Sequence, residues 1–204
     1  MGITVYRCGP PQDPELVART VEQAATGGAD AVMFTSATGA TEWLRIAERA
    51  GALPRIGARA ARGRLLVAAV GPVTAKPLTD AGLRTTTAAR GRLGSLVRCV
   101  VDHYASGRAA RVRTDAGTLE VRSGGAVLNG DFVPLSRASA DVLDALSGAG
   151  GRVLTREELG RVLPRAGQNS HAVEMAVARL REALGRADVV NTVIKRGYRL
   201  AVAE

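Results

Sequence analysis

The order of predicted strands and helices changes near residue 107, and this change constrains the fold more than any other feature of the sequence. Before it, apolar strands such as Asp30–Phe34 and Arg64–Val70 alternate with helices. After it, four short strands come first, and three helices and a hairpin follow. Alternation predicts a parallel sheet with crossover helices, whereas grouped strands and helices predict an α+β unit. We therefore expect two domains, residues 1–107 and 108–204.

In the N-terminal half, turn and capping residues divide the apolar segments. Asp13 is placed to cap a helix with Pro14 at its first position, and Gly27 to end it. The predicted strands are Ile3–Arg7, Asp30–Phe34, Arg64–Val70 and Leu83–Thr87, and the predicted helices span residues 15–25, 40–50, 72–81 and 95–105. This half is predicted to be an α/β domain with a parallel sheet.

In the C-terminal half, two local motifs are specific. Asn129-Gly130 between β-rich runs predicts a tight hairpin. Thr155 with Glu158 matches a capping box, which predicts a helix from Arg156. The predicted strands are Arg111–Thr114, Thr118–Arg122, Ala126–Asn129 and Phe132–Leu135, the helices span 137–148, 156–163 and 170–185, and a hairpin of 189–195 and 197–202 follows.

Composition excludes several classes of protein. The chain has no apolar run of the roughly 18 residues that a membrane span needs. Its N-terminus has no basic segment followed by a long apolar one, so we predict no secretory signal and a cytoplasmic location. Cys8 and Cys99 are far apart and form neither a disulfide framework nor a metal motif. We therefore expect reduced thiols, no metal site and no cofactor.

The charge of the chain is compatible with an anionic partner for either half. The formal net charge is +9, and the basic residues are 26 Arg and 2 Lys. Residues 1–119 hold 16 basic and 9 acidic side chains, and residues 120–204 hold 12 and 10. The first of these segments has the larger basic excess, but charge alone does not choose between the two halves.

The third C-terminal helix is predicted to be amphipathic. At about 100° per residue, Val173, Val177 and Leu180 share one face, and Met175 and Arg179 lie opposite. A helix with one buried stripe and an exposed arginine fits the major groove of DNA. The alternative is an ordinary helix with one solvated face.

The phrases GRVLTREEL, SHAVEMAVARLREALG and NTVIKRGYRL resemble the winged-helix DNA-binding domain of OmpR/PhoB-type response regulators. The resemblance covers about residues 110–202 and implies double-stranded DNA as partner, with a homodimer on DNA as one arrangement. The expected DNA-binding residues lie on the third helix and the final hairpin: His171, Met175, Arg179, Arg181, Thr192, Lys195, Arg196 and Tyr198. The hairpin departs from the family pattern, because Ile194 and Lys195 stand where an Arg and a Gly are usual.

The phrases VYRCGPP, DAVMFTSATGATEWL and VAAVGPVTAKPLTDAGL resemble the second half of uroporphyrinogen-III synthase, which cyclises a linear tetrapyrrole with eight carboxylates. The resemblance covers residues 1–107 and implies that Tyr6, Thr35, Ser36 and Thr74 face a ligand. Helix N-termini at strand ends suit carboxylates, which agrees with this reading. The plainer alternative is that the hydroxyls after Phe34 only cap the next helix.

Three functions remain open from the sequence. The first is a DNA-binding transcriptional regulator with a synthase-like sensor of a tetrapyrrole or another carboxylate, and the resemblance suggests regulators of nitrite and nitrate assimilation. The second is a uroporphyrinogen-III synthase, a lyase, with a DNA-binding appendage. We favour the first because the resemblance covers only one of the synthase family's two domains. A chain truncated at its N-terminus would also explain this. The third is a degraded synthase domain used only for dimerisation or docking.

Overall fold

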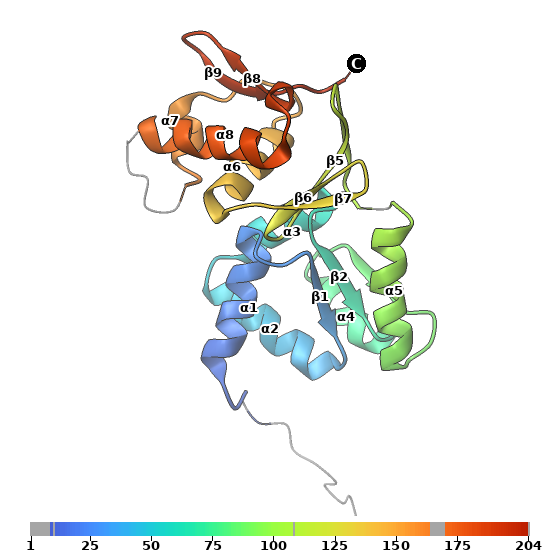
Figure 1. The fold of residues 1–204 in the computed structure, drawn as a ribbon. Coiled ribbons are helices and arrows are strands. Elements are labelled where there is room, and N and C mark those ends of the chain that lie inside the picture. Colours follow the sequence, from blue (N-terminus) through green and yellow to red (C-terminus); the bar gives the residue numbers. More distant parts are fainter. Residues whose placement is uncertain (1–8, 10, 108, 164–169, 204) are drawn as a thin grey trace, which may run out of the picture. The chain divides into compact units, whose positions relative to one another are not determined.

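The computed structural model describes residues 9, 11–107, 109–163 and 170–203. The chain divides into two compact units, Met1–Ala109 and Ala110–Glu204. Figure 1 shows a parallel sheet with helices in the first unit, and strands, three helices and a hairpin in the second. The predicted strand Ile3–Arg7 lies outside the described residues.

The first unit is built on three parallel strands in the order β1-β2-β3. The strands are β1 (Ala31–Phe34), β2 (Leu66–Ala69) and β3 (Thr85–Thr87), and the helices are α1 (Pro14–Thr26), α2 (Ala37–Arg49), α3 (Leu53–Ala61), α4 (Pro72–Asp80) and α5 (Leu93–Ala105). The register pairs Phe34 with Ala69, so β1 and β2 end side by side. The parallel α/β fold predicted for this half is confirmed.

The two faces of this sheet are covered by different helices. Val67 and Ala69 belong to a core shared with α1, α2, α3 and α4. Leu66 and Ala68 point the other way and pack against Leu96 of α5. This alternation follows from the period of two in a strand, and burial on both faces explains why β2 reads as a continuous apolar run.

Capping residues fix both ends of α1, as predicted, whereas α3 was not predicted from the sequence. Asp13 Oδ1 accepts a hydrogen bond from the backbone N–H of Leu16 at 2.8 Å, and Gly27 ends α1 with φ of +91°. The sequence analysis predicted no helix between residues 51 and 64, a segment that contains Pro54 and Gly57. Pro54 lies in the first turn, where its missing N–H costs nothing, and burial of Ile56 holds the helix against the core.

The second unit begins with a four-stranded antiparallel sheet in the order β4-β5-β6-β7. Its elements are β4 (Val112–Thr114), β5 (Gly117–Arg122), β6 (Gly125–Leu128), β7 (Asp131–Pro134), α6 (Arg137–Gly148), α7 (Arg156–Gly160), α8 (Ser170–Leu184), a 3-10 turn (Ala187–Val189), β8 (Val190–Val193) and β9 (Gly197–Leu200). Asn129 and Gly130 connect β6 to β7 with φ of +55° and +99°, which suits a tight two-residue turn. The predicted winged-helix fold is confirmed.

Helix α7 begins with the predicted capping box and is shorter than predicted. Thr155 Oγ1 accepts from the N–H of Glu158 at 3.1 Å, and the Thr155 N–H donates to Glu158 Oε2 at 2.8 Å. That N–H and the Arg152 guanidinium lower the pKa of Glu158, because both stabilise the carboxylate. The helix ends at Gly160, where the sequence predicted Leu163.

Candidate nucleic-acid interface and ligand crevice

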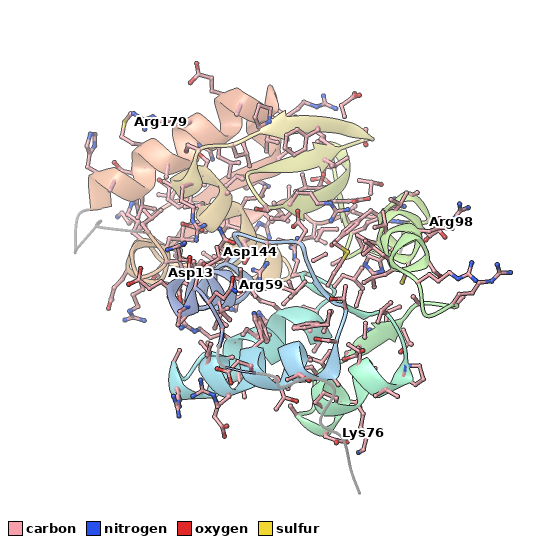
Figure 2. The ribbon with its side chains drawn as sticks, turned by 90° about the horizontal axis from the view of Figure 1, so that it is seen from below. Asp13, Arg59, Lys76, Arg98, Asp144 and Arg179 are labelled. Carbon is pink, nitrogen blue, oxygen red and sulfur yellow. The ribbon has the colours of Figure 1, made fainter. Side chains whose placement is uncertain are left out.

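Helix α8 presents the two faces that its sequence predicted. Val173, Val177 and Leu180 are buried in the core of the second unit. On the opposite face His171 and Arg179 are exposed, and Met175 is 39% exposed. Figure 2 shows Arg179 projecting from α8 away from the body of its unit. The helix therefore offers a polar ridge with one long cation at its centre.

The helix is held in place by α6 and α7. Val142 and Leu146 of α6 share its core, and Leu159 of α7 packs into the same cluster. Arg156 of α7 also forms an ion pair with Glu174 of α8, with 3.0 Å between Nε and Oε1. Because apolar contacts fix two neighbouring helices against α8, its exposed face is presented by a rigid support.

Arg181 joins α8 to the hairpin. Its Nε donates to the carbonyl oxygen of Val190 at 3.0 Å, and its Nη2 donates to Thr192 Oγ1 at 2.9 Å. The sequence analysis expected Arg181 to contact phosphate, and it expected Thr192 to contact DNA. In the structure these two side chains bind each other, because β8 runs beside the last turns of α8.

The side chain of Tyr198 is in the core, not on the surface. It is 5% exposed, and its backbone N–H donates to the carbonyl oxygen of Leu154 at 2.9 Å. The guanidinium groups of Arg156 and Arg181 lie 5.5 and 5.9 Å from the centre of its ring. The sequence analysis expected Tyr198 to touch DNA, and in the structure most of its ring surface is packed in the core of the second unit.

The tip of the hairpin consists of Ile194, Lys195 and Arg196. All three side chains are exposed, and Ile194 reaches 82%. Lys195 has φ of +60°, the conformation that explains a glycine at this place in the family pattern. Sequence reasoning treated Ile194 as a departure only and did not identify it as the most exposed apolar side chain of the hairpin.

Three cations at this interface have no partner among the described residues. Neither the helix residue Arg179 nor the hairpin residues Lys195 and Arg196 form an ion pair or a side-chain hydrogen bond there. Glu182, one turn from Arg179, does not pair with it. Unpaired guanidinium and ammonium groups are available to a phosphate or to the acceptor atoms of a base edge.

In the first unit, two of the predicted ligand residues directly follow β1, at the edge where β1 and β2 end side by side. The backbone N–H of Val70 donates to the carbonyl oxygen of Phe34 at 3.0 Å, which holds the two ends together. Thr35 and Ser36 are exposed just beyond β1. Ser36 caps α2, since its Oγ accepts from the N–H of Gly39 at 3.1 Å.

The other two predicted ligand residues are placed less favourably. Thr74 lies in the first turn of α4 and is only 6% exposed. Tyr6 lies outside the described residues. Within the described part of the chain there is no group of three or more His, Cys, Asp or Glu that could hold a metal ion, and no helix there is long and apolar enough to cross a membrane.

Comparisons with known proteins assign each half separately. Residues 1–98 match the family model described as uroporphyrinogen-III synthase HemD, and residues 130–200 match the one described as transcriptional regulatory protein, C terminal. The N-terminal half is thus uroporphyrinogen-III synthase-like, and the C-terminal domain is that of a transcriptional regulator. No curated protein matches the chain.

Several solved DNA-binding domains are similar to the second unit. One is the RstA DNA-binding domain of Klebsiella pneumoniae in complex with RstA box, 26% identical, covering 45% of this chain and 96% of that one with a TM-score of 0.37. Another is the DNA-binding domain of E. coli CadC, 31% identical, covering 39% and 80% with a TM-score of 0.35. A third is the DNA-binding domain of the response regulator AdeR in complex with an intercistronic region, 20% identical, covering 42% and 95% with a TM-score of 0.38.

Proposed function

We propose that this chain, a uroporphyrinogen-III synthase-like domain followed by an OmpR/PhoB-type winged helix, is a DNA-binding transcriptional regulator. The observation that carries the proposal is Arg179 at the centre of the exposed face of α8, where it forms no ion pair or side-chain hydrogen bond with another described residue. The opposite face of α8 is packed in the core. A positioned arginine on a rigid helix is the commonest means of reading guanine in the major groove.

The interface residues divide into two roles. Arg179 is the base reader, because its fork of donors matches the two acceptors of guanine. Lys195 and Arg196 at the hairpin tip meet phosphates, which position the protein without reading sequence. His171 and Met175 flank Arg179 on the same face and add contacts to neighbouring groups. Two copies bound to adjacent half-sites would form the homodimer that the resemblance allows.

The first unit is proposed to sense a carboxylate, with a tetrapyrrole as the first candidate. Support comes from the adjacent ends of β1 and β2, which present Thr35 beside the N-terminus of α2. A helix N-terminus offers backbone N–H groups to an anion. Genes of nitrite and nitrate assimilation are the targets that the resemblance suggests.

The test is selection of bound DNA from a random pool, carried out with and without hydroxymethylbilane. We expect one motif to be enriched, and its recovery to change with the tetrapyrrole. The Arg179→Ala variant should enrich a motif that is degenerate at one position. An Arg113→Ala control removes the same charge from an exposed position on β4, which is part of neither α8 nor the hairpin. If the unchanged protein enriches no motif, the regulator proposal fails.

Catalysis by the first unit is the second candidate, favoured by the match of residues 1–98 to the synthase model. We place it behind sensing because Ser36 is engaged in capping and the Thr74 side chain is buried. Incubation with hydroxymethylbilane, with separation of the cyclised products, decides between them. Enzymatic formation of uroporphyrinogen III above the spontaneous rate would establish the synthase instead.

A further inference from the structure

A cavity of about 600 Å³ lies in the first unit, against β2, β3 and α5. This volume is within the range of small-molecule sites in proteins. Leu66 of β2 and Ala89 are apolar members of its lining, and Thr86 of β3 carries a hydroxyl on the same face of the sheet as Leu66. Because β3 is an outer strand of the described sheet, its side chains reach the cavity without a further strand covering them.

The charges that line this cavity favour an anion. Arg84, just before β3, and Arg98, on α5, both line it. Neither forms an ion pair or a side-chain hydrogen bond with another described residue. Asp102 contributes one negative charge, which leaves the lining with a formal excess of one positive charge when His103 is neutral. Figure 2 shows Arg98 on α5, the helix that forms one wall.

We propose that this cavity binds a small organic anion, a carboxylate or phosphate carried on an apolar body. The guanidinium groups supply charge-assisted hydrogen bonds to the anionic head, and the apolar part of the lining accommodates the body. The cavity is separate from the predicted ligand residues at the ends of β1 and β2, since none of Thr35, Ser36 and Thr74 lines it. The proposal names a ligand class for the proposed sensing function and rests on that function. Binding of the anion itself can be tested without DNA.

Cys99 provides a reporter inside the site. Its thiol is free and half-buried, and the residue lines the cavity on α5. In the full chain carrying Cys8→Ser, alkylation of Cys99 by N-ethylmaleimide is followed by mass spectrometry. Phenyl phosphate is the probe with an apolar body, and inorganic phosphate at equal ionic strength is the probe without one. We expect phenyl phosphate to slow alkylation saturably, and inorganic phosphate to be clearly weaker.

Substitutions in the lining test the role of charge. Arg84→Gln and Arg98→Gln should each raise the half-saturating concentration of phenyl phosphate about tenfold, the loss typical of a charge-assisted hydrogen bond. Asp102→Asn should lower it, because a like charge is removed. Arg55→Gln is the matched control, since this exposed residue of α3 does not line the cavity, and it should change nothing. Fluorescence of Trp43 checks that each variant is folded.

Three results would overturn the proposal: no protection of Cys99 by phenyl phosphate, equal protection by inorganic phosphate, or equal effects of Arg55→Gln and Arg98→Gln. Retention of the selected DNA is measured on the same variants. If the protein retains DNA but Cys99 is not protected, the site fails and the regulator stands. If Cys99 is protected but no DNA motif is enriched, the site stands and the regulator fails.

Discussion

The guanidinium carbon of Arg181 lies 5.9 Å from the centre of the Tyr198 ring, and the same group donates to the carbonyl oxygen of Val190. The first residue is on α8, and the second is on β9. Arg181 therefore braces the helix that carries Arg179 against the hairpin that carries Lys195. The relative position of the proposed base reader, Arg179, and the proposed phosphate contact, Lys195, depends on this contact.

Replacing Arg181 with Met should lower the free energy of unfolding of the second unit by about 2 kcal/mol, from lost hydrogen bonds of a charged donor and the contact with Tyr198. Arg181→Lys keeps the charge but not the planar fork, so it should be nearly as destabilising. Urea denaturation followed by far-UV circular dichroism measures both. If the Lys variant restored stability and DNA affinity together, Arg181 would be a phosphate contact and not a brace.

Replacing Arg179 with Ala should cost roughly 1–3 kcal/mol on the selected DNA site and relax preference at one base pair. Binding to random DNA should weaken much less, because that binding depends on phosphate contacts. Titration of both DNAs at several salt concentrations measures the difference. Arg113→Ala, in β4, is the control and should leave the ratio of the two affinities unchanged. Equal weakening on both DNAs would show that Arg179 does not read bases.

At Lys195, φ is +60°, so charge and backbone strain can be separated by two substitutions. Lys195→Gly and Lys195→Ala both remove the ammonium group, and each should reduce the salt slope of DNA binding by about one. The Gly variant should be more stable than the Ala variant by about 1 kcal/mol, because glycine enters the left-handed region without a steric penalty. Equal salt slopes for Lys195→Ala and the unchanged protein would remove Lys195 from the interface.

At Gly197, φ is +137°, and a Cβ there would lie 2.0 Å from the carbonyl oxygen of Leu154. Gly197→Ala should therefore displace β9 from the backbone of Leu154 and cost more than about 2 kcal/mol of stability. Gly124→Ala is the control, because its φ is +73° but a Cβ there meets nothing within 4 Å. It should cost about 1 kcal/mol. Similar losses for both variants would show that the close approach to Leu154 relaxes freely.

The pKa of the Asp141 carboxyl is raised, chiefly by burial and against the favourable hydrogen bond from Arg137. A carboxyl whose pKa is higher in the folded state loses folding free energy as pH rises from its unfolded value of 3.8 through the folded value. Asp141→Asn should therefore be more stable than the unchanged protein near neutral pH, and this advantage should disappear below pH 3.8. Denaturation at a series of pH values measures it. An advantage that persisted at low pH would come from packing and not from ionisation.

Local sequence determined the features that depend on neighbours along the chain. The turn at Asn129-Gly130, the capping box of Thr155 and Glu158, and the buried and exposed faces of α8 all followed from short spacings. Each involves backbone groups or side chains within a few residues, so the sequence specifies them directly. The α/β class of the first half followed in the same way from alternating strands and helices.

Tertiary structure decided which of the residues predicted to lie at a binding surface are accessible to DNA or a ligand. Tyr198 and Thr74 are buried, and Arg181 donates hydrogen bonds to Val190 and Thr192. Helix α3 forms despite Pro54 and Gly57 because Ile56 is buried in a core assembled from distant segments. The cavity with Arg84 and Arg98 likewise joins a strand end to a helix that follows it. Periodicity assigns a face to a residue, but burial and hydrogen bonding depend on what the folded chain brings against that face.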